Sequence, residues 1–282
     1  MSVVGLGALA LALPTALAVV TLPNDAIGYI ATARNWVMGR GFVDPVVYSY
    51  YLPGASPPIP AMAVRPPIVS ILFALPLHLG AGLVGLGVLH ALWSASIGAS
   101  ILLVGRRFMS LPAATAAAIG VAWSPNWWRS STQLLTETTS VGALLLLLAL
   151  TPRALRSPLG AVGLACATLI GWLVRPNLAG FAVVVVGAAI WSWGGRSALR
   201  SRPLWTYLLT FALLHQMTAM LFNAIHGFAP YAHYGVMAET LTMVDVRSYQ
   251  AEYSGVLGHA IRNAGEIANT LVGNLRTTAV FL

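Results

Sequence analysis

The sequence predicts an all-α fold, a polytopic membrane helix bundle of about seven transmembrane helices with a long outer loop that contains interfacial helices. Three observations predict it. Of the 282 residues, 58% are hydrophobic and only 8% are charged, whereas a soluble domain carries about 25% charged residues. The apolar residues gather in runs close to the roughly 20 residues that cross about 30 Å of hydrocarbon. All basic residues are arginines, and seven of them lie in short loops that hold no acid.

Seven apolar runs are long enough to be membrane spans. They are residues 2–22, 82–105, 110–127, 133–150, 157–174, 178–194 and 204–224. The first run lacks the basic n-region of a cleavable signal peptide, so we interpret it as a retained span. Residues 68–80 are also apolar, but they are too few to cross and contain Pro76. We therefore expect an interfacial helix there.

The charges predict which loops lie in the cytoplasm. If the N-terminus is cytoplasmic, the cytoplasmic loops hold only basic charges: Arg106, Arg107, Arg153, Arg156, Arg196, Arg200 and Arg202. The opposite side receives every acid: Asp25, Asp44, Glu137, Glu239, Asp245, Glu252 and Glu266. An arginine excess in short loops on one side is the positive-inside signature. Topology therefore explains the net charge of +8, and we expect an inner- or plasma-membrane protein without a nucleic-acid partner.

The chain divides into a transmembrane module, residues 1–226, and an outer-face segment, residues 227–282. The outer loop of the module covers residues 23–81, and the second segment is polar enough to form amphipathic surface helices. The chain stops at Leu282 on an apolar pair, so we interpret it as the front part of a longer protein. Isolated histidines such as His90 in apolar runs are more typical of bundle packing than of ligand binding.

The outer loop carries the first candidate site. Asn24-Asp25 opens a helical pattern in which Asp25, Tyr29, Thr32 and Trp36 share one face. The apolar residues Ala26, Ile30, Ala33 and Val37 share another. Asn24 or Asp25 could cap the helix and favour its dipole. Alternatively, Asp25 is a general base or a metal ligand that faces a polar substrate. The sequence leaves both roles open, and the two can hold together.

The other candidate residues also lie on the predicted outer side. Glu137 begins an apolar run, where a carboxylate would cost about 2.5–3.5 kcal/mol at the membrane centre, or else it is a first-turn acid favoured by the dipole. Arg65 and Arg175, with Asn177 nearby, depart from the positive-inside rule. Guanidinium groups suit phosphate, so we expect an anionic ligand. The alternative is an ion pair with Asp25 or Glu137.

The order of these features resembles the GT-C class of membrane glycosyltransferases, which includes protein O-mannosyltransferases and the aminoarabinose transferases that modify lipid A. In that class, a first span is followed by an outer loop that opens on an acid and an aromatic residue. A Pro-Pro interfacial helix and a span that ends in a basic pair come next. A later acid and a Gly-rich span with a basic end follow. The matching residues are Asp25 with Tyr29, Arg65-Pro66-Pro67 through Gly80, Arg106-Arg107-Phe108, Glu137 and Arg175-Pro176. Their succession over about residues 1–225, and no single motif, carries the resemblance.

The resemblance implies an inverting transferase that takes a hexose or pentose from a polyprenyl-phosphate donor to a lipid, glycan or protein acceptor. Asp25 and Glu137 would be catalytic, with Asp25 as the base. Tyr29, Arg65, Arg175 and Asn177 would bind substrate, the arginines near the phosphate. Some relatives bind a divalent metal cation at the loop carboxylates, which makes Asp25 a candidate ligand.

Two other classes of function remain open. A lipid or solute transporter, or a flippase, would place ionisable residues and broken helices near the midplane, often in internal repeats. The sequence has neither mid-span carboxylates nor a convincing repeat. A non-catalytic subunit of a membrane complex would turn its outer charges toward partners instead of gathering them at one site.

Overall fold

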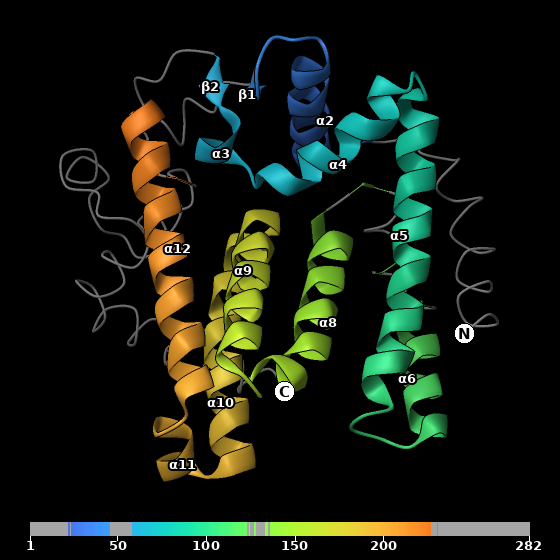
Figure 1. Ribbon diagram of the computed structural model, residues 1–282. Coiled ribbons are helices and arrows are strands. Elements are labelled where there is room, and N and C mark those ends of the chain that lie inside the picture. Colours follow the sequence, from blue (N-terminus) through green and yellow to red (C-terminus); the bar gives the residue numbers. More distant parts are fainter. Residues whose placement is uncertain are drawn as a thin grey trace, which may run out of the picture. The chain divides into compact units, whose positions relative to one another are not determined.

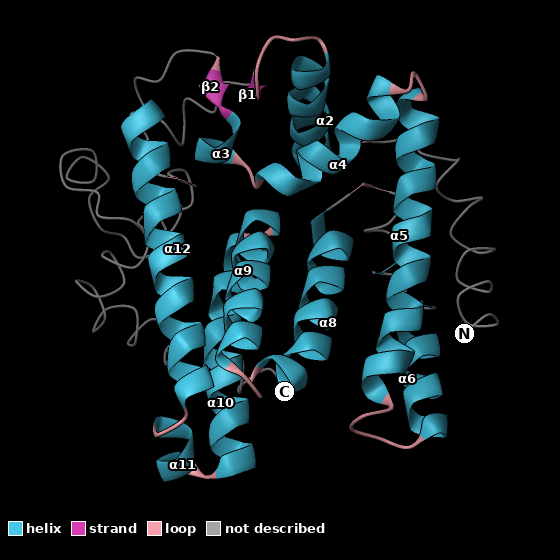
Figure 2. Cartoon of the chain, in the orientation of Figure 1, coloured by secondary structure: helices cyan, strands magenta, loops and turns pink. Residues whose placement is uncertain are grey.

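The computed structural model describes residues 24–45, 58–122 and 136–226, together with Leu22, Ser124, Trp127, Gln133, Leu134 and Pro230. The described chain is mostly helical, as Figure 2 shows. It divides into a larger unit, Met1–Val43 with Pro66–Met217, and a smaller unit, Asp44–Arg65 with Thr218–Leu282. The predicted first span, residues 2–22, lies outside the described residues except for Leu22, and so does the predicted segment 227–282 except for Pro230.

Three of the described helices are long and apolar enough to cross a membrane (Figure 1). They are α5 (Gly82–Gly105), the continuous segment of η1 (Pro176–Gly180) and α10 (Phe181–Trp193), and α12 (Arg202–His226). At about 1.5 Å per residue, α5 is roughly 36 Å long, which exceeds the hydrocarbon thickness of about 30 Å. These helices agree closely with three of the predicted spans.

The remaining helices of the larger unit are shorter. They are α2 (Asn24–Val37), α4 (Pro67–His78), α6 (Leu111–Ala122), α8 (Thr136–Ala154), α9 (Pro158–Val174) and α11 (Gly195–Leu199). The helix α4 has 12 residues, so the prediction of an apolar helix too short to cross is confirmed. The predicted spans that correspond to α6, α8 and α9 remain predictions.

The corner between α4 and α5 has a clear origin in the sequence. Gly80 adopts a positive φ of 73° and its N–H bonds to the carbonyl of Leu77, while the N–H of Ala81 bonds to the carbonyl of Pro76. This pair of bonds is the Schellman motif, which favours glycine at the left-handed position. The helix α4 therefore ends at the Leu79-Gly80 sequence.

The turn between α8 and α9 is equally local. The Ser157 side chain accepts a hydrogen bond from the N–H of Gly160, and Pro158 occupies the first turn of α9. Serine caps and first-turn prolines are typical helix starts. A Cβ on Gly160 would lie 2.5 Å from the carbonyl oxygen of Ala154, so only glycine lets the two helices reverse so tightly.

Two buried clusters hold the larger unit together. One lies between α8, α9, α10, α11 and α12, and includes Leu147, Leu164 and Tyr207, whose hydroxyl lies 3.2 Å from Thr168 Oγ1. The other joins α2 to α4 and α5 through residues such as Tyr29 and Phe73. The helix α4 also contacts α9, so it links the two parts of the unit.

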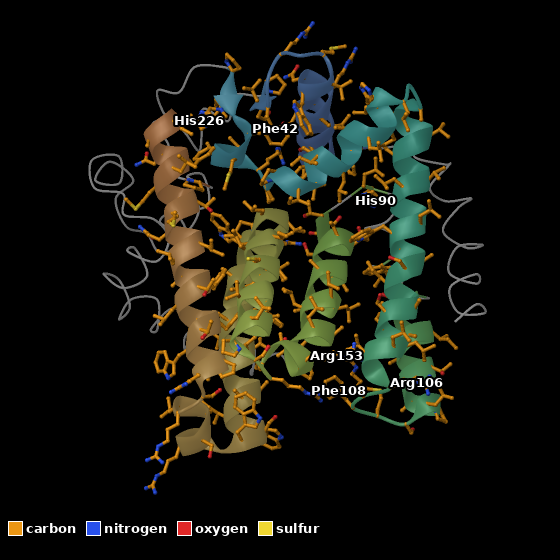
Figure 3. The ribbon with its side chains drawn as sticks, in the orientation of Figure 1. Phe42, His90, Arg106, Phe108, Arg153 and His226 are labelled. Carbon is orange, nitrogen blue, oxygen red and sulfur yellow. The ribbon has the colours of Figure 1, made fainter. Side chains whose placement is uncertain are left out.

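The arginine-rich turns gather at one end of the larger unit. Figure 3 places Arg106 and Phe108, after α5, at the same end as Arg153 of α8. Arg107 Nη1 donates a hydrogen bond of 2.7 Å to the carbonyl of Ala149 and so joins the two turns. The helices α2 and α4 lie at the opposite end, where α8 begins and α9 ends (Figure 1). The arrangement agrees with the predicted separation of loops.

The smaller unit contains the rest of the outer loop that the structure describes. Strand β1 (Val43–Asp44), which begins at the end of the larger unit, pairs with β2 (Ile59–Pro60), and the short helix α3 (Ala61–Val64) follows. Arg65 then adopts extended backbone angles, φ −134° and ψ 148°. Pro66 explains this conformation, because a residue before proline is pushed out of the helical region.

Candidate functional site

Glu137 and Arg175 form an ion pair at the end of the larger unit that carries α2 and α4. Glu137 lies in the first turn of α8, and Arg175 follows α9. Arg175 Nη1 lies 3.1 Å from Glu137 Oε1. Pro176 keeps the backbone of Arg175 extended, at φ −157° and ψ 128°. The Arg-Pro sequence thus ends α9 at the residue whose side chain reaches α8.

The pair is only partly covered, and its carboxylate is not fully hydrogen-bonded. The Arg175 and Glu137 side chains are 33% and 44% exposed, so a ligand can reach both. Glu137 Oε2, however, is buried and has no hydrogen-bond partner among the described residues. A buried carboxylate oxygen without a partner is unfavourable, so the ion pair with Arg175 leaves this carboxylate incompletely satisfied. Asn177, two residues beyond Arg175 on η1, is exposed.

Two side chains of α5 hold the residue next to Glu137. Trp93 Nε1 donates a hydrogen bond of 3.2 Å to the carbonyl of Thr138, and His90 Nδ1 lies 3.4 Å from Thr138 Oγ1. A Cβ on Gly142 would lie 2.9 Å from the Trp93 ring, so glycine at this position lets the indole reach α8. The first turns of α8 are therefore fixed by packing against α5.

His90 is a packing residue, as the sequence indicated. It is 3% exposed, and its ring centre lies 5.5 Å from that of Phe73 on α4. It thus fills the space where α4, α5 and α8 meet. Figure 3 labels this histidine. The carbonyl contact of Trp93 and the contact of His90 with Thr138 were not expected from the sequence. An aromatic residue three positions after a buried histidine is a weak signal for such a contact.

The exposed and buried faces of α2 differ from the predicted ones. Asp25 is exposed in the first turn, as expected of an acid that favours the helix dipole. Tyr29 and Thr32, which were expected on the same face as Asp25, are 4% and 0% exposed. The buried stripe of α2 is wider than the apolar pattern, because α4 packs along it with Val69 and Phe73. The substrate-binding role of Tyr29 stays a prediction, now for a buried residue.

Arg65 forms an ion pair with Asp44 in the smaller unit. Its Nε donates to Asp44 Oδ2 at 3.1 Å, and the two side chains are 7% and 0% exposed. The sequence left open an ion pair for Arg65, but with Asp25 or Glu137 as the partner. The structure pairs Arg65 with Asp44, an acid on the same predicted side that was not among the expected partners. Its position directly after Val43 in an extended, apolar stretch was the available signal.

The predicted site residues include members of two ion pairs, one in each unit. Glu137 and Arg175 lie together with Asn177 close by in sequence, whereas Arg65 belongs to a buried pair in the other unit. Asp25 is not a member of either pair. Over the residues that the structure describes, no group of three or more His, Cys, Asp and Glu side chains could hold a metal ion.

No protein-family model, curated protein or solved structure matches this chain. The resemblance to the GT-C class therefore stays a prediction carried by the succession of sequence motifs.

Proposed function

We propose that this chain is a multi-pass membrane glycosyltransferase that moves a sugar from a polyprenyl-phosphate donor to an acceptor on the extracytoplasmic face. The observation that carries the proposal is the Glu137–Arg175 pair, a partly exposed guanidinium beside a partly unsatisfied carboxylate. It lies at the end of the larger unit opposite the arginine-rich turns. The order of the sequence motifs, which resembles that of the GT-C class, indicates the type of reaction.

The proposed topology has seven spans and a cytoplasmic N-terminus. Three long apolar helices support it, as do the short turns at one end, which carry seven exposed arginines and no acid. The helix α12 also presents large apolar side chains outward, Leu209, Leu213 and Met217 among them, which suits contact with lipid. In this topology the Glu137–Arg175 pair lies at the extracytoplasmic surface.

In the proposed reaction, the acceptor hydroxyl oxygen attacks the anomeric carbon of the donor. The bond from that carbon to the phosphate oxygen breaks, and polyprenyl phosphate leaves with the bonding electrons. The Asp25 carboxylate takes the hydroxyl proton, a role that requires hydrogen-bond reach in the substrate complex. The leaving phosphate gains negative charge, which the Arg175 guanidinium stabilises. Direct displacement inverts the anomeric carbon.

A divalent cation has no step in this proposal. Some of the relatives that the sequence resembles bind such an ion at loop carboxylates, with Asp25 as the matching residue. Asp25 belongs to no described group of three or more His, Cys, Asp and Glu side chains that could hold a metal ion. Its role as a metal ligand stays a prediction.

The test is sugar transfer by the purified full chain in liposomes, with a radiolabelled polyprenyl-phosphate sugar and extracts of membrane acceptors. We expect transfer by the wild type and strong loss in Arg175→Gln, because a guanidinium that touches the leaving phosphate acts on the transition state. Arg196→Gln, an exposed arginine at the opposite end, is the control. Movement of the labelled lipid across the bilayer without sugar transfer would contradict the proposal and favour a flippase.

A further inference from the structure

We propose that Glu137 and the phosphate of the donor compete for Arg175, so that their ion pair is a latch that closes the phosphate site in the ligand-free protein. The inference rests on the proposed function and adds a means of regulation to the same site. It follows from how incompletely the two side chains satisfy each other.

The guanidinium of Arg175 uses only a small part of its binding capacity. One nitrogen, Nη1, contacts one oxygen of Glu137 at 3.1 Å, and the side chain is 33% exposed. Arginine offers five N–H donors in a rigid fork that matches two oxygens of a phosphate or carboxylate. A phosphate that presents two oxygens to this fork makes a better partner than the single oxygen of Glu137.

Glu137 is equally incomplete as a partner. Its second oxygen, Oε2, is buried without a hydrogen bond to any described residue, although Oε1 faces the arginine. The carboxylate therefore sits where α8 places it, not where it would chelate the guanidinium. The Trp93 and His90 contacts to Thr138 fix that position from α5.

The buried pair of the smaller unit provides the contrast within this chain. Arg65 and Asp44 are almost completely covered, with side chains 7% and 0% exposed. A charged partner cannot leave such a pair without a large penalty. The Glu137–Arg175 pair is partly exposed, with the Arg175 and Glu137 side chains 33% and 44% accessible. An ion pair in contact with solvent contributes up to about five-fold to an equilibrium constant. A phosphate can overcome a contribution of this size.

The competition predicts opposite effects for the two partners. Replacing Glu137 by Gln frees the guanidinium and removes a negative charge from the site, so phosphate binding tightens. Replacing Arg175 by Gln removes the phosphate ligand, so binding weakens. A site in which Glu137 and Arg175 bind the same phosphate-containing ligand side by side would instead lose affinity in both variants.

The experiment measures binding of farnesyl phosphate, a short lipid-linked phosphate, to the full chain in detergent micelles by isothermal titration. The proteins are wild type, Glu137→Gln, Arg175→Gln and the double variant. We expect Glu137→Gln to bind up to about five-fold more tightly and Arg175→Gln at least about tenfold more weakly. The double variant should match Arg175→Gln, because Glu137 acts through Arg175. Inorganic phosphate, titrated in parallel, tests whether the lipid chain contributes.

Unchanged or weaker binding by Glu137→Gln would overturn the latch. A full tightening in the Arg175→Gln background would also overturn it, because Glu137 would then only repel anions. Inorganic phosphate binding as tightly as farnesyl phosphate would overturn the lipid-linked source. Sugar transfer is measured separately. If the two variants change binding in opposite directions but the wild type transfers no sugar, the latch stands and the proposed function is refuted. If the wild type transfers sugar but Glu137→Gln does not bind more tightly, the proposed function stands and the latch is refuted.

Discussion

The buried pair of Arg65 and Asp44 leads to a prediction that separates a structural role from a binding role. Arg65→Met removes the guanidinium that pairs with the Asp44 carboxylate, whose side chain is 0% exposed. Breaking a buried pair in this way costs about 3–5 kcal/mol. Replacing both residues, in Arg65→Met/Asp44→Leu, removes both charges and should recover most of the loss, because apolar replacements of a buried pair are often neutral.

Hydrogen–deuterium exchange with mass spectrometry reports this loss locally. The N–H of Arg65 bonds to the carbonyl of Ala61 at 2.7 Å, so the peptide over residues 59–65 reads the opening of this segment. If the whole cost falls on local opening, exchange accelerates by roughly 100- to 5,000-fold in Arg65→Met and returns close to wild type in the double variant.

Two results would refute this reasoning. Acceleration below about tenfold in the single variant would mean that the pair does not hold the segment. A double variant as unprotected as the single one would mean that Arg65 is needed for another reason. The same proteins test the expected phosphate contact: if the double variant recovers protection and binds farnesyl phosphate like wild type, Arg65 is only a structural residue.

Three further predictions concern the helices that carry the site. Gly160→Ala should lower the thermal unfolding midpoint, at a cost of about 1–3 kcal/mol, because its Cβ would lie 2.5 Å from the Ala154 carbonyl oxygen. Gly163→Ala is the control and should not lower the midpoint, since nothing lies within 4 Å of its Cβ position. Gly142→Ala should destabilise the protein by a similar amount, since its Cβ would lie 2.9 Å from the Trp93 ring. In a Trp93→Ala background the same substitution should lower the free energy of unfolding by less. An equal loss in both backgrounds would contradict the contact between Gly142 and Trp93. Asp25→Asn should reduce sugar transfer by about 10²–10⁴-fold, as for loss of a general base, with farnesyl phosphate binding unchanged; retained transfer would exclude this base.

The sequence predicted the helices best where the signals are local. The run 82–105 coincides with α5, and the run 157–174 with α9, because an apolar stretch bounded by Gly, Ser-Pro or Arg-Pro specifies both its length and its ends. The helix over 68–80 was also expected to be too short to cross. These features depend on residues that are neighbours in the chain.

The contacts between distant residues were harder to predict. Periodicity placed Tyr29 beside Asp25, but packing of α4 along α2 buries Tyr29 and leaves Asp25 exposed. Arg65 pairs with an acid 21 residues away, a choice that only the fold of the outer loop can make. For Arg175, the sequence offered an ion pair with Asp25 or Glu137 as the alternative to an anionic ligand. It could not choose between the two acids, because both were expected on the same side of the membrane as Arg175.

Sugar transfer by the purified chain tests the central claim most directly. Wild type and Arg175→Gln are compared in liposomes that contain one polyprenyl-phosphate sugar, with Arg196→Gln as the matched control at the opposite end of the unit. We predict transfer by the wild type and the control, and loss of at least about tenfold in Arg175→Gln, as expected when a charge-assisted hydrogen bond to phosphate is removed. Equal transfer by all three proteins would contradict a phosphate site at the Glu137–Arg175 pair.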